Sequence, residues 1–263
     1  MAAHTPLIRA RREGAATGLP IVFSHALGMD LSMWDAVVAA LAPRHPILRY
    51  DHRGQGGSAW SGQPYDIEAL VDDAAAMVAG WGRGPVLFVG LSMGGGVAQG
   101  LAIRHPQAVR GLMLANTAAV YPEAGREGLR QRAATVRAGG MAAILEATLE
   151  RFLSADCRAN QPAAVQQVSS ILRRADPAGY AAACEAIVPT DWLGALGQVA
   201  CPVHVLAGTL DVGAPPAVGR QIAEAIPGAS CAELPTAHLS AVESPQAFVA
   251  QLQGLIDRIG SVV

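Results

Sequence analysis

The chain has 263 residues, 51% of them hydrophobic, and a formal net charge of −2. It is long enough to bury a full core as one α/β domain, and its charge provides no general attraction to nucleic acid or to an anionic membrane. All 19 basic residues are arginine, which excludes a Schiff-base lysine, pyridoxal phosphate attachment and a Walker-type phosphate loop.

The cysteines and the N-terminus predict a cytoplasmic location. The four cysteines are dispersed without a C-x-x-C pair, so we expect buried free thiols in a reducing compartment and neither a zinc site nor a disulfide framework. The N-terminal residues contain no apolar stretch of signal-peptide length, and no window of about 18 residues is apolar enough to cross a membrane.

Short apolar runs alternate with helical patterns in the first part of the chain. We expect an edge strand in residues 6–12, buried strands at residues 21–23, 47–50, 86–89 and 109–114, and helices at residues 30–41, 67–78 and 95–104. This alternation predicts parallel strand pairing in a doubly wound α/β sheet. Asp72 and Asp73 are expected on a solvated helix face.

The strand pattern stops between residues 118 and 196, where the sequence is rich in alanine, arginine and glutamine and helical in pattern. Strands are expected again at residues 203–207 and 230–234, and an amphipathic helix at residues 246–259. We therefore predict an α/β core formed by residues 1–117 and 197–263, with residues 118–196 as a helical cap over the sheet.

The sequence GLSMG at residues 90–94 lies between a predicted strand and a predicted helix. A serine at such a sharp turn has a strained backbone, which requires small residues two positions before and after it. The turn exposes the hydroxyl of Ser92 and places the N–H of Met93 at a helix N-terminus, where it can stabilise an oxyanion. The alternative is a glycine-rich turn that only packs closely on its sheet.

A serine nucleophile needs a base, and that base needs an orienting acid. In this topology ligands lie beyond the carboxyl ends of the strands, and the expected chain order is serine, acid, histidine. Asp211 and His238 each follow a predicted strand downstream of Ser92. Asp191, at the end of the cap, is the rival acid. The other histidines lie inside a strand, at loop or helix ends, in the N-terminus, or upstream of the serine: His4, His25, His45, His52, His105 and His204.

The second oxyanion donor is expected in the loop after the strand at residues 21–23, which reads HALG at residues 25–28. We assign it to the N–H of Leu27, with Ala26 as the alternative. His25 is expected to fix this loop rather than to transfer protons.

Together these residues resemble the α/β-hydrolase superfamily over essentially the whole chain. The matching segments are SHALG (24–28), DHRGQG (51–56), GLSMGG (90–95), GTLD (208–211) and AH (237–238). The chain is most similar to 3-oxoadipate enol-lactonases, through LGMDLSMW (27–34), LRYD (48–51) and ANTAA (115–119). The resemblance implies an α/β-hydrolase fold, a Ser-Asp-His triad, no metal or organic cofactor, and opening of the enol-lactone to 3-oxoadipate in aromatic catabolism.

That lactone carries a free carboxylate, so an arginine is expected to reach the pocket. Arg151 is our choice, because LERF at residues 149–152 resembles the family's cap segment, in which Trp is typical where this chain has Phe152. Trp34 and Phe152 are expected to line an apolar part of the pocket, and Arg53 to brace the loop after its strand. The alternatives to Arg151 are Arg130, Arg132 and Arg137.

Other functions share this fold. A broad-specificity carboxylesterase or a cofactor-free perhydrolase or haloperoxidase would use the same triad. A non-catalytic ligand receptor on the same fold is expected to have lost or repurposed triad members, whereas all three positions are filled here. A haloalkane dehalogenase is disfavoured because it requires a carboxylate in place of Ser92. The expected partner is a small ester or lactone, and the oligomeric state is left open.

Overall fold

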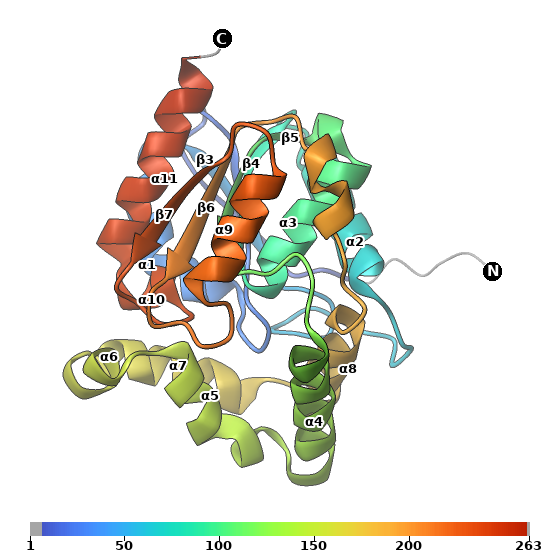
Figure 1. The fold of residues 1–263 in the computed structure, drawn as a ribbon. Coiled ribbons are helices and arrows are strands. Elements are labelled where there is room, and N and C mark those ends of the chain that lie inside the picture. The colour runs from blue at the N-terminus through green and yellow to red at the C-terminus, as the bar shows by residue number, and fades with distance from the viewer. Residues whose placement is uncertain (1–6, 262–263) are drawn as a thin grey trace.

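A seven-stranded sheet forms the centre of the protein in the computed structural model, which describes residues 7–261 (Figure 1). The order across the sheet is β1-β3-β2-β4-β5-β6-β7; β1 is antiparallel to β3, and all the other pairs are parallel. This arrangement confirms the predicted doubly wound sheet. The strands are β1 (Ala10–Gly14), β2 (Ile21–Ser24), β3 (Pro46–Tyr50), β4 (Val86–Leu91), β5 (Val109–Ala115), β6 (Val203–Gly208) and β7 (Ser230–Leu234).

Helices cover both faces of the sheet (Figure 1). On one face lie α1 (Asp35–Leu41) and α11 (Pro245–Gly260); on the other lie α2 (Ile67–Trp81), α3 (Met93–Arg104) and α9 (Pro216–Ala225). Strands β2, β4 and β6 are buried along their whole length because both of their faces are covered. This is why they read as continuous apolar runs rather than as alternating patterns.

Several elements differ in detail from the sequence predictions. The edge strand begins at Ala10 rather than at residue 6; Pro6, like His4, lies outside the described residues. The helix expected from residue 30 begins as a 3-10 turn, η1 (Leu31–Trp34), because the Asp30 side chain accepts a hydrogen bond from the N–H of Ser32. Helix α3 begins directly after Ser92, two residues earlier than predicted.

The prediction of a solvated face at residues 72 and 73 is wrong for Asp73. Its carboxylate is buried in α2 and accepts hydrogen bonds from Nε and Nη2 of Arg53, at 2.6 and 2.7 Å. A buried carboxylate is stable only when it is paired in this way. Asp72 is exposed as expected, and Arg53 braces its loop through this contact with α2.

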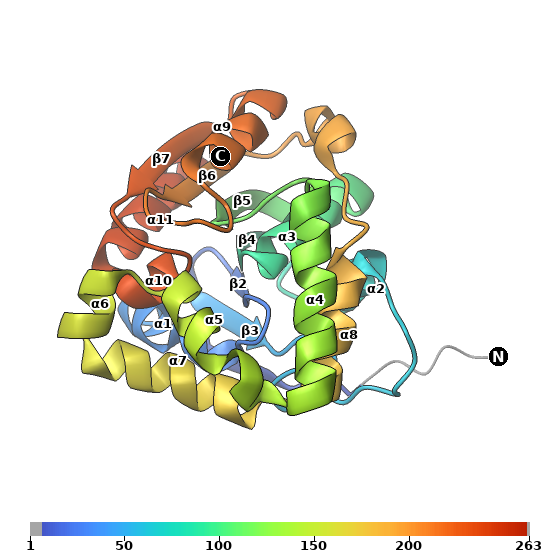
Figure 2. The ribbon, with the colours of Figure 1, turned by 60° about the horizontal axis from the view of Figure 1, so that its bottom comes forward.

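A helical segment between β5 and β6 lies across the edge of the sheet at which the parallel strands end (Figures 1 and 2). An antiparallel bridge between Val120 and Asp191, with a 2.9 Å hydrogen bond from the N–H of Trp192 to the carbonyl of Ala119, brings its two ends together. We propose that residues 118–196 form a cap on the core, and we use that name below. Its helices are α4 (Glu123–Gly139), η3 (Met141–Ile144), α5 (Leu145–Phe152), α6 (Ala155–Asn160), α7 (Pro162–Arg174), α8 (Pro177–Ile187) and the first part of η4 (Leu193–Gln198).

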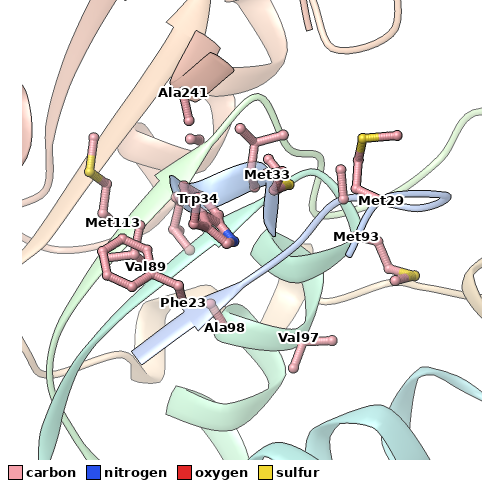
Figure 3. Close-up of a cluster of buried hydrophobic side chains, with 14 of the residues drawn as sticks. Phe23, Met29, Met33, Trp34, Val89, Met93, Val97, Ala98, Met113 and Ala241 are labelled. Atoms are coloured by element: carbon pink, nitrogen blue, oxygen red, sulfur yellow. The ribbon is translucent and has the colours of Figure 1, made fainter. Parts of the chain in front are cut away.

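Trp34 belongs to the apolar core (Figure 3). Its side chain is fully buried, with ring centroids 5.0 Å from Phe23 and 5.8 Å from Phe248. The expectation that Trp34 lines an apolar part of the pocket is therefore wrong, because Phe23 of β2 and Phe248 of α11 pack on the indole in the core and Trp34 is not in the cavity wall.

The predictions for the cysteines and for membrane-spanning segments can be compared with the structure. All four cysteines are free, as expected; Cys157 and Cys184 are buried, whereas Cys201 is half-buried and Cys231 is exposed, so the expectation of buried thiols is only partly correct. Among residues 7–261, no helix combines the length and the apolar character needed to span a bilayer.

Candidate active site

Ser92 occupies the tight turn between β4 and α3. Its backbone has φ 56° and ψ −116°, a conformation that is costly for a residue with a side chain. A Cβ atom at Gly90 would overlap the carbonyl of Gly94, and one at Gly94 would overlap the carbonyl of Ser24. The turn is also held by Thr117, whose hydroxyl donates to the Ser92 carbonyl at 2.7 Å. Only glycine at both positions allows this close packing, which explains the spacing of the motif.

Ser92, His238 and Asp211 form one hydrogen-bonded chain. His238 Nδ1 lies 2.7 Å from Asp211 Oδ2, and Nε2 lies 2.8 Å from Ser92 Oγ. An ionised carboxylate only accepts hydrogen bonds, so the imidazole donates from Nδ1 and accepts the serine hydroxyl proton at Nε2. The three side chains come together because β4, β6 and β7 end at the same edge of the sheet.

The surroundings of Asp211 keep its carboxylate ionised. The N–H groups of Gly213 and Ala214 donate to Oδ1 at 2.8 and 3.0 Å, and Nδ2 of Asn116 donates to Oδ2 at 3.0 Å. Burial alone would raise the pKa of Asp211, but attraction to His238 and the hydrogen bonds lower it below its ordinary value. The rival Asp191 is exposed at the base of the cap, where it accepts a hydrogen bond from the N–H of Leu193.

Asn116 is a site residue to which the sequence analysis gave no role. It follows β5 with φ 47°, a left-handed conformation that asparagine tolerates better than most residues. Besides Asp211, Nδ2 contacts the carbonyl of Ala237 at 3.2 Å, and Oδ1 accepts from the hydroxyl of Ser240 at 2.5 Å. Its signal in the sequence was available: a polar residue two positions after the strand predicted at residues 109–114, at the edge where the other site residues were expected.

The backbone N–H groups of Leu27 and Met93 fit an oxyanion hole. Leu27 lines the cavity beside Ser92, and Met93 begins α3. Within residues 7–261 neither N–H has a hydrogen-bond acceptor. The N–H of Ala26 is also free, but Ala26 is absent from the cavity wall, which favours Leu27.

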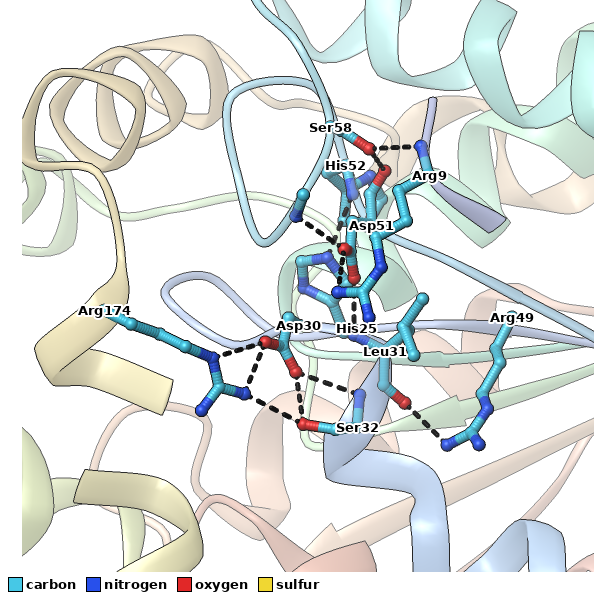
Figure 4. Close-up of polar contacts among 11 residues, drawn as sticks. Arg9, His25, Asp30, Leu31, Ser32, Arg49, Asp51, His52, Ser58 and Arg174 are labelled. Atoms are coloured by element: carbon cyan, nitrogen blue, oxygen red, sulfur yellow. Dashed lines mark hydrogen bonds and ion pairs between the residues drawn. The ribbon is translucent and has the colours of Figure 1, made fainter. Parts of the chain in front are cut away.

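A network of buried polar side chains holds the loop that carries Leu27 (Figure 4). His25 donates from Nδ1 to the carbonyl of Ala26 at 2.8 Å and accepts the N–H of His52 at Nε2 at 3.0 Å, so it fixes the loop as expected. The side chain of Gln55 accepts the N–H of Gly28 at 2.7 Å. Burial lowers the pKa of His25, and burial with repulsion from His25 lowers the pKa of His52 well below its ordinary value. Burial thus favours the neutral form of both imidazoles.

A small cavity of about 70 Å³ lies between the sheet edge and the cap. Phe152 stacks on the His238 ring, with centroids 5.3 Å apart and an angle of 23° between the planes. The guanidinium of Arg151 lies 5.1 Å from the centroid of the Phe152 ring. Both residues thus line the cavity, as predicted, together with Leu27, Ser92, Asn116, Thr117, Ala118, Tyr121, Leu129, Arg132, Ile187, Gly213, Ala214 and His238.

The cavity is positively charged. Arg151 and Arg132 line it, and among the residues that the structure describes no Asp or Glu belongs to its wall. Nη2 of Arg151 is buried and makes no hydrogen bond among the described residues. Burial, and then repulsion from Arg132, lower the pKa of its guanidinium, although the nearby Tyr180 hydroxyl favours the charged form. The other two arginines considered in place of Arg151 are paired outside the cavity. Nη1 of Arg130 donates to Oε1 of Glu123 at 2.8 Å, and Nη2 of Arg137 donates to Oε2 of Glu185 at 2.8 Å. A cavity with this charge and an unsatisfied donor is suited to an anionic group.

The sheet order and the strand–turn–helix at Ser92 define an α/β hydrolase. The chain belongs to the alpha/beta hydrolase fold family, whose model matches residues 20–245. It is 33% identical to 3-oxoadipate enol-lactonase 2 of Acinetobacter baylyi, over 93% of this chain and 91% of that protein.

Two solved structures are similar to nearly the whole chain. The enol-lactonase from Burkholderia xenovorans LB400 has a TM-score of 0.93 and 35% identity, covering 98% of this chain and 99% of that one. A thermophilic esterase from Thermogutta terrifontis has a TM-score of 0.90 and 28% identity, covering 96% and 93%. The predicted resemblance is confirmed, and these relationships make the chain a carboxylic-ester hydrolase.

Proposed function

We propose that the protein opens an enol-lactone that carries a free carboxylate, 3-oxoadipate enol-lactone being the substrate, through an acyl-enzyme on Ser92. One observation carries this proposal: the unpartnered, buried Nη2 of Arg151 belongs to the wall of the same small cavity as Ser92 and His238. The similarity to the two enol-lactonases supports it. Such a reaction would place the protein in aromatic catabolism, and the free thiols fit the cytoplasm.

In the first step His238 Nε2 takes the proton of the Ser92 hydroxyl as Oγ attacks the lactone carbonyl. Their separation of 2.8 Å is within reach for general base catalysis. The imidazolium that forms is stabilised by Asp211, whose lowered pKa keeps it ionised. The N–H groups of Leu27 and Met93 receive the developing oxyanion, each such donor being worth roughly 3–4 kcal/mol in comparable sites.

Collapse of the tetrahedral intermediate breaks the bond between the carbonyl carbon and the ring oxygen. His238 returns its proton to that oxygen, which leaves as an enol and tautomerises to the ketone. Because the ring is opened rather than split, the enol stays covalently attached through the acyl chain. Water activated by His238 then hydrolyses the acyl-enzyme and regenerates the Ser92 hydroxyl.

The substrate carboxylate is proposed to pair with Arg151. A guanidinium in a site shielded from water binds a carboxylate strongly, because less hydration has to be displaced from the arginine when the ligand enters. Arg132 also lines the cavity and adds to the positive potential, while its Nε donates to the carbonyl of Gly128 at 3.2 Å. Phe152, stacked on His238, would supply the apolar wall against which the lactone ring packs.

The test is the rate of hydrolysis of enzymatically generated 3-oxoadipate enol-lactone against neutral esters and lactones of similar size. We expect selectivity of about 100-fold for the carboxylated lactone, corresponding to about 3 kcal/mol in the barrier. Ser92→Ala and His238→Ala are expected to lose at least about a thousandfold in kcat. An unchanged rate in Ser92→Ala would refute the mechanism, and equal rates on neutral substrates would refute the substrate.

A broad-specificity carboxylesterase is the second candidate, supported by the similarity to the Thermogutta terrifontis esterase. It predicts rates on neutral esters at least equal to those on the lactone. Peracid formation from an ester and hydrogen peroxide, at rates exceeding hydrolysis, would favour a perhydrolase. No turnover and no labelling of Ser92 by a serine-directed phosphonate would favour a non-catalytic receptor.

A further inference from the structure

Residues 235–239, between β7 and α10 (Ser240–Glu243), carry His238 and are called the histidine loop below. Glu243, at the end of α10, joins this loop to the cap. Its side chain is buried, and its Oε2 accepts two backbone hydrogen bonds, each 3.1 Å long. One comes from the N–H of Ala237, the residue before His238. The other comes from the N–H of Ser154, the N-cap residue just before α6 in the cap. A single carboxylate oxygen thus bridges two segments that are 83 residues apart.

The same two segments meet through Phe152. The N–H of Leu239 donates to the Phe152 carbonyl at 3.0 Å, and the Phe152 ring stacks on His238. His238 is therefore flanked in the sequence by two residues, Ala237 and Leu239, whose N–H groups are tied to residues 152–154 directly or through Glu243. The end of α5 therefore lies next to the start of α10.

The histidine loop depends on such contacts. It follows β7, the last strand of the sheet, and Leu239 has φ −98° and ψ 61°, so no regular ladder fixes the backbone here. On the core side Asn116 contacts the carbonyl of Ala237. On the cap side the anchors are the hydrogen bond from Leu239 to the Phe152 carbonyl and the bridge through Glu243. Glu243 belongs to none of the ion pairs found among the described residues, and its Oε2 is satisfied by the two backbone N–H donors.

We propose that Glu243 is a positioning residue for His238, which fixes the histidine loop to the cap segment 152–154. The inference rests on the proposed role of His238 as the base that activates Ser92. Glu243 itself touches no reacting atom and acts through the backbone of Ala237. The cap thereby does more than enclose the substrate, because it contributes to the geometry of proton transfer.

The test compares Glu243→Ala with Glu243→Gln on p-nitrophenyl acetate, a neutral ester that does not depend on Arg151. Glutamine keeps an oxygen that accepts both N–H groups, so kcat is expected to stay within about 3-fold of the unaltered protein. Glu243→Ala is expected to lower kcat and the rate of phosphonate labelling of Ser92 about 10- to 100-fold with little change in KM, because small misplacement of a catalytic group has effects of this size.

A second pair of variants removes one donor without touching Glu243. Ser154 has φ −61°, and Leu153 before it is extended, so proline fits at position 154. Ser154→Pro removes the N–H, whereas Ser154→Ala keeps it and loses only the side-chain cap on Cys157. We expect kcat to fall about 10-fold further in Ser154→Pro than in Ser154→Ala. This comparison decides the question even when Glu243→Ala does not fold.

His204→Ala is the control for stability. His204 is also buried and makes two side-chain hydrogen bonds, to Ser230 and Gln251, but it lies near the start of β6, away from the active-site edge. It is expected to lower Tm without changing kcat. Unchanged kcat in Glu243→Ala with only a lowered Tm, or equal rates in the two Ser154 variants, would overturn the inference. Full turnover by His238→Ala would instead overturn the proposed function.

Discussion

Replacing Arg151 by methionine separates recognition of the substrate charge from catalysis. Methionine keeps a long apolar side chain over Phe152 but removes the cation. A hydrogen bond to a charged group contributes about 1.5–3 kcal/mol, so kcat/KM for the carboxylated lactone is expected to fall about 10- to 150-fold. For a neutral ester of the same size we expect a change of no more than about 3-fold, since Arg151 has no interaction to make with it.

The same substitution has an unusual expected effect on stability. Nη2 of Arg151 is buried without a hydrogen-bond partner among the described residues, and burial lowers the pKa of the guanidinium, so its charge is held at a cost in desolvation. Removing such a charge avoids the cost of its desolvation. We therefore expect Arg151→Met to have a Tm equal to or higher than that of the unaltered protein in the absence of ligand, while losing the rise in Tm that the carboxylate product produces.

Two further variants are controls for the Arg151→Met experiment. Arg151→Lys keeps the charge but not the planar fork, and should recover part of the lost kcat/KM. Arg130→Met removes an exposed cap arginine that is paired with Glu123, and should leave both substrates unaffected. Equal losses on the lactone and the neutral ester would refute the reasoning, because they would show that Arg151 acts by packing on Phe152. No loss on either substrate would locate the carboxylate elsewhere.

Three other predictions concern residues that support the catalytic side chains and the loops around them. Asn116→Ala should lower kcat about 10-fold and stability by about 1–3 kcal/mol, because it removes a donor to Asp211 and disfavours a left-handed backbone; unchanged kinetics would contradict this. Gly94→Ala should abolish phosphonate labelling of Ser92 and reduce the free energy of unfolding by at least about 1–3 kcal/mol, since its Cβ would overlap a carbonyl. The buried histidines should make stability depend on pH. His52 has a lowered pKa when folded, so its contribution is complete above about pH 6.5 and decreases as the pH falls, by up to about 1.4 kcal/mol per unit. Denaturant unfolding at pH 7.5 and 5.5 should show a smaller difference in His52→Gln; an equal difference would exclude His52 as the source.

Most of the sheet was predictable because its strands are short apolar runs that helices cover on both faces. The positions of Asp211 and His238 followed from a topological rule, since the carboxyl ends of parallel strands meet at one edge. The prediction for Trp34 was wrong because the sequence pattern did not show which surroundings its apolar face meets. A helical pattern shows that one face of a short helix is apolar, but it does not tell whether that face meets the core or a ligand. The prediction for Asp73 was wrong in the opposite sense, because a residue expected in solvent is buried. Its partner Arg53 comes from the loop after β3, which the sequence around Asp73 does not reveal.

The sequence by itself determined the fold class, the strained turn at Ser92 and the chain order of the acid and the histidine. These properties depend on local composition and on strand ends, which neighbouring residues specify. Only the tertiary structure decided that a buried nitrogen of Arg151 without a hydrogen-bond partner lines the cavity, that Asn116 supports Asp211, and that Glu243 joins Ala237 to Ser154. Asn116 and Asp211 are 95 residues apart and Glu243 and Ser154 are 89 apart, and no pattern along the chain specifies a hydrogen bond over such a distance. Those contacts exist because the cap and the histidine loop return to the same edge of the sheet.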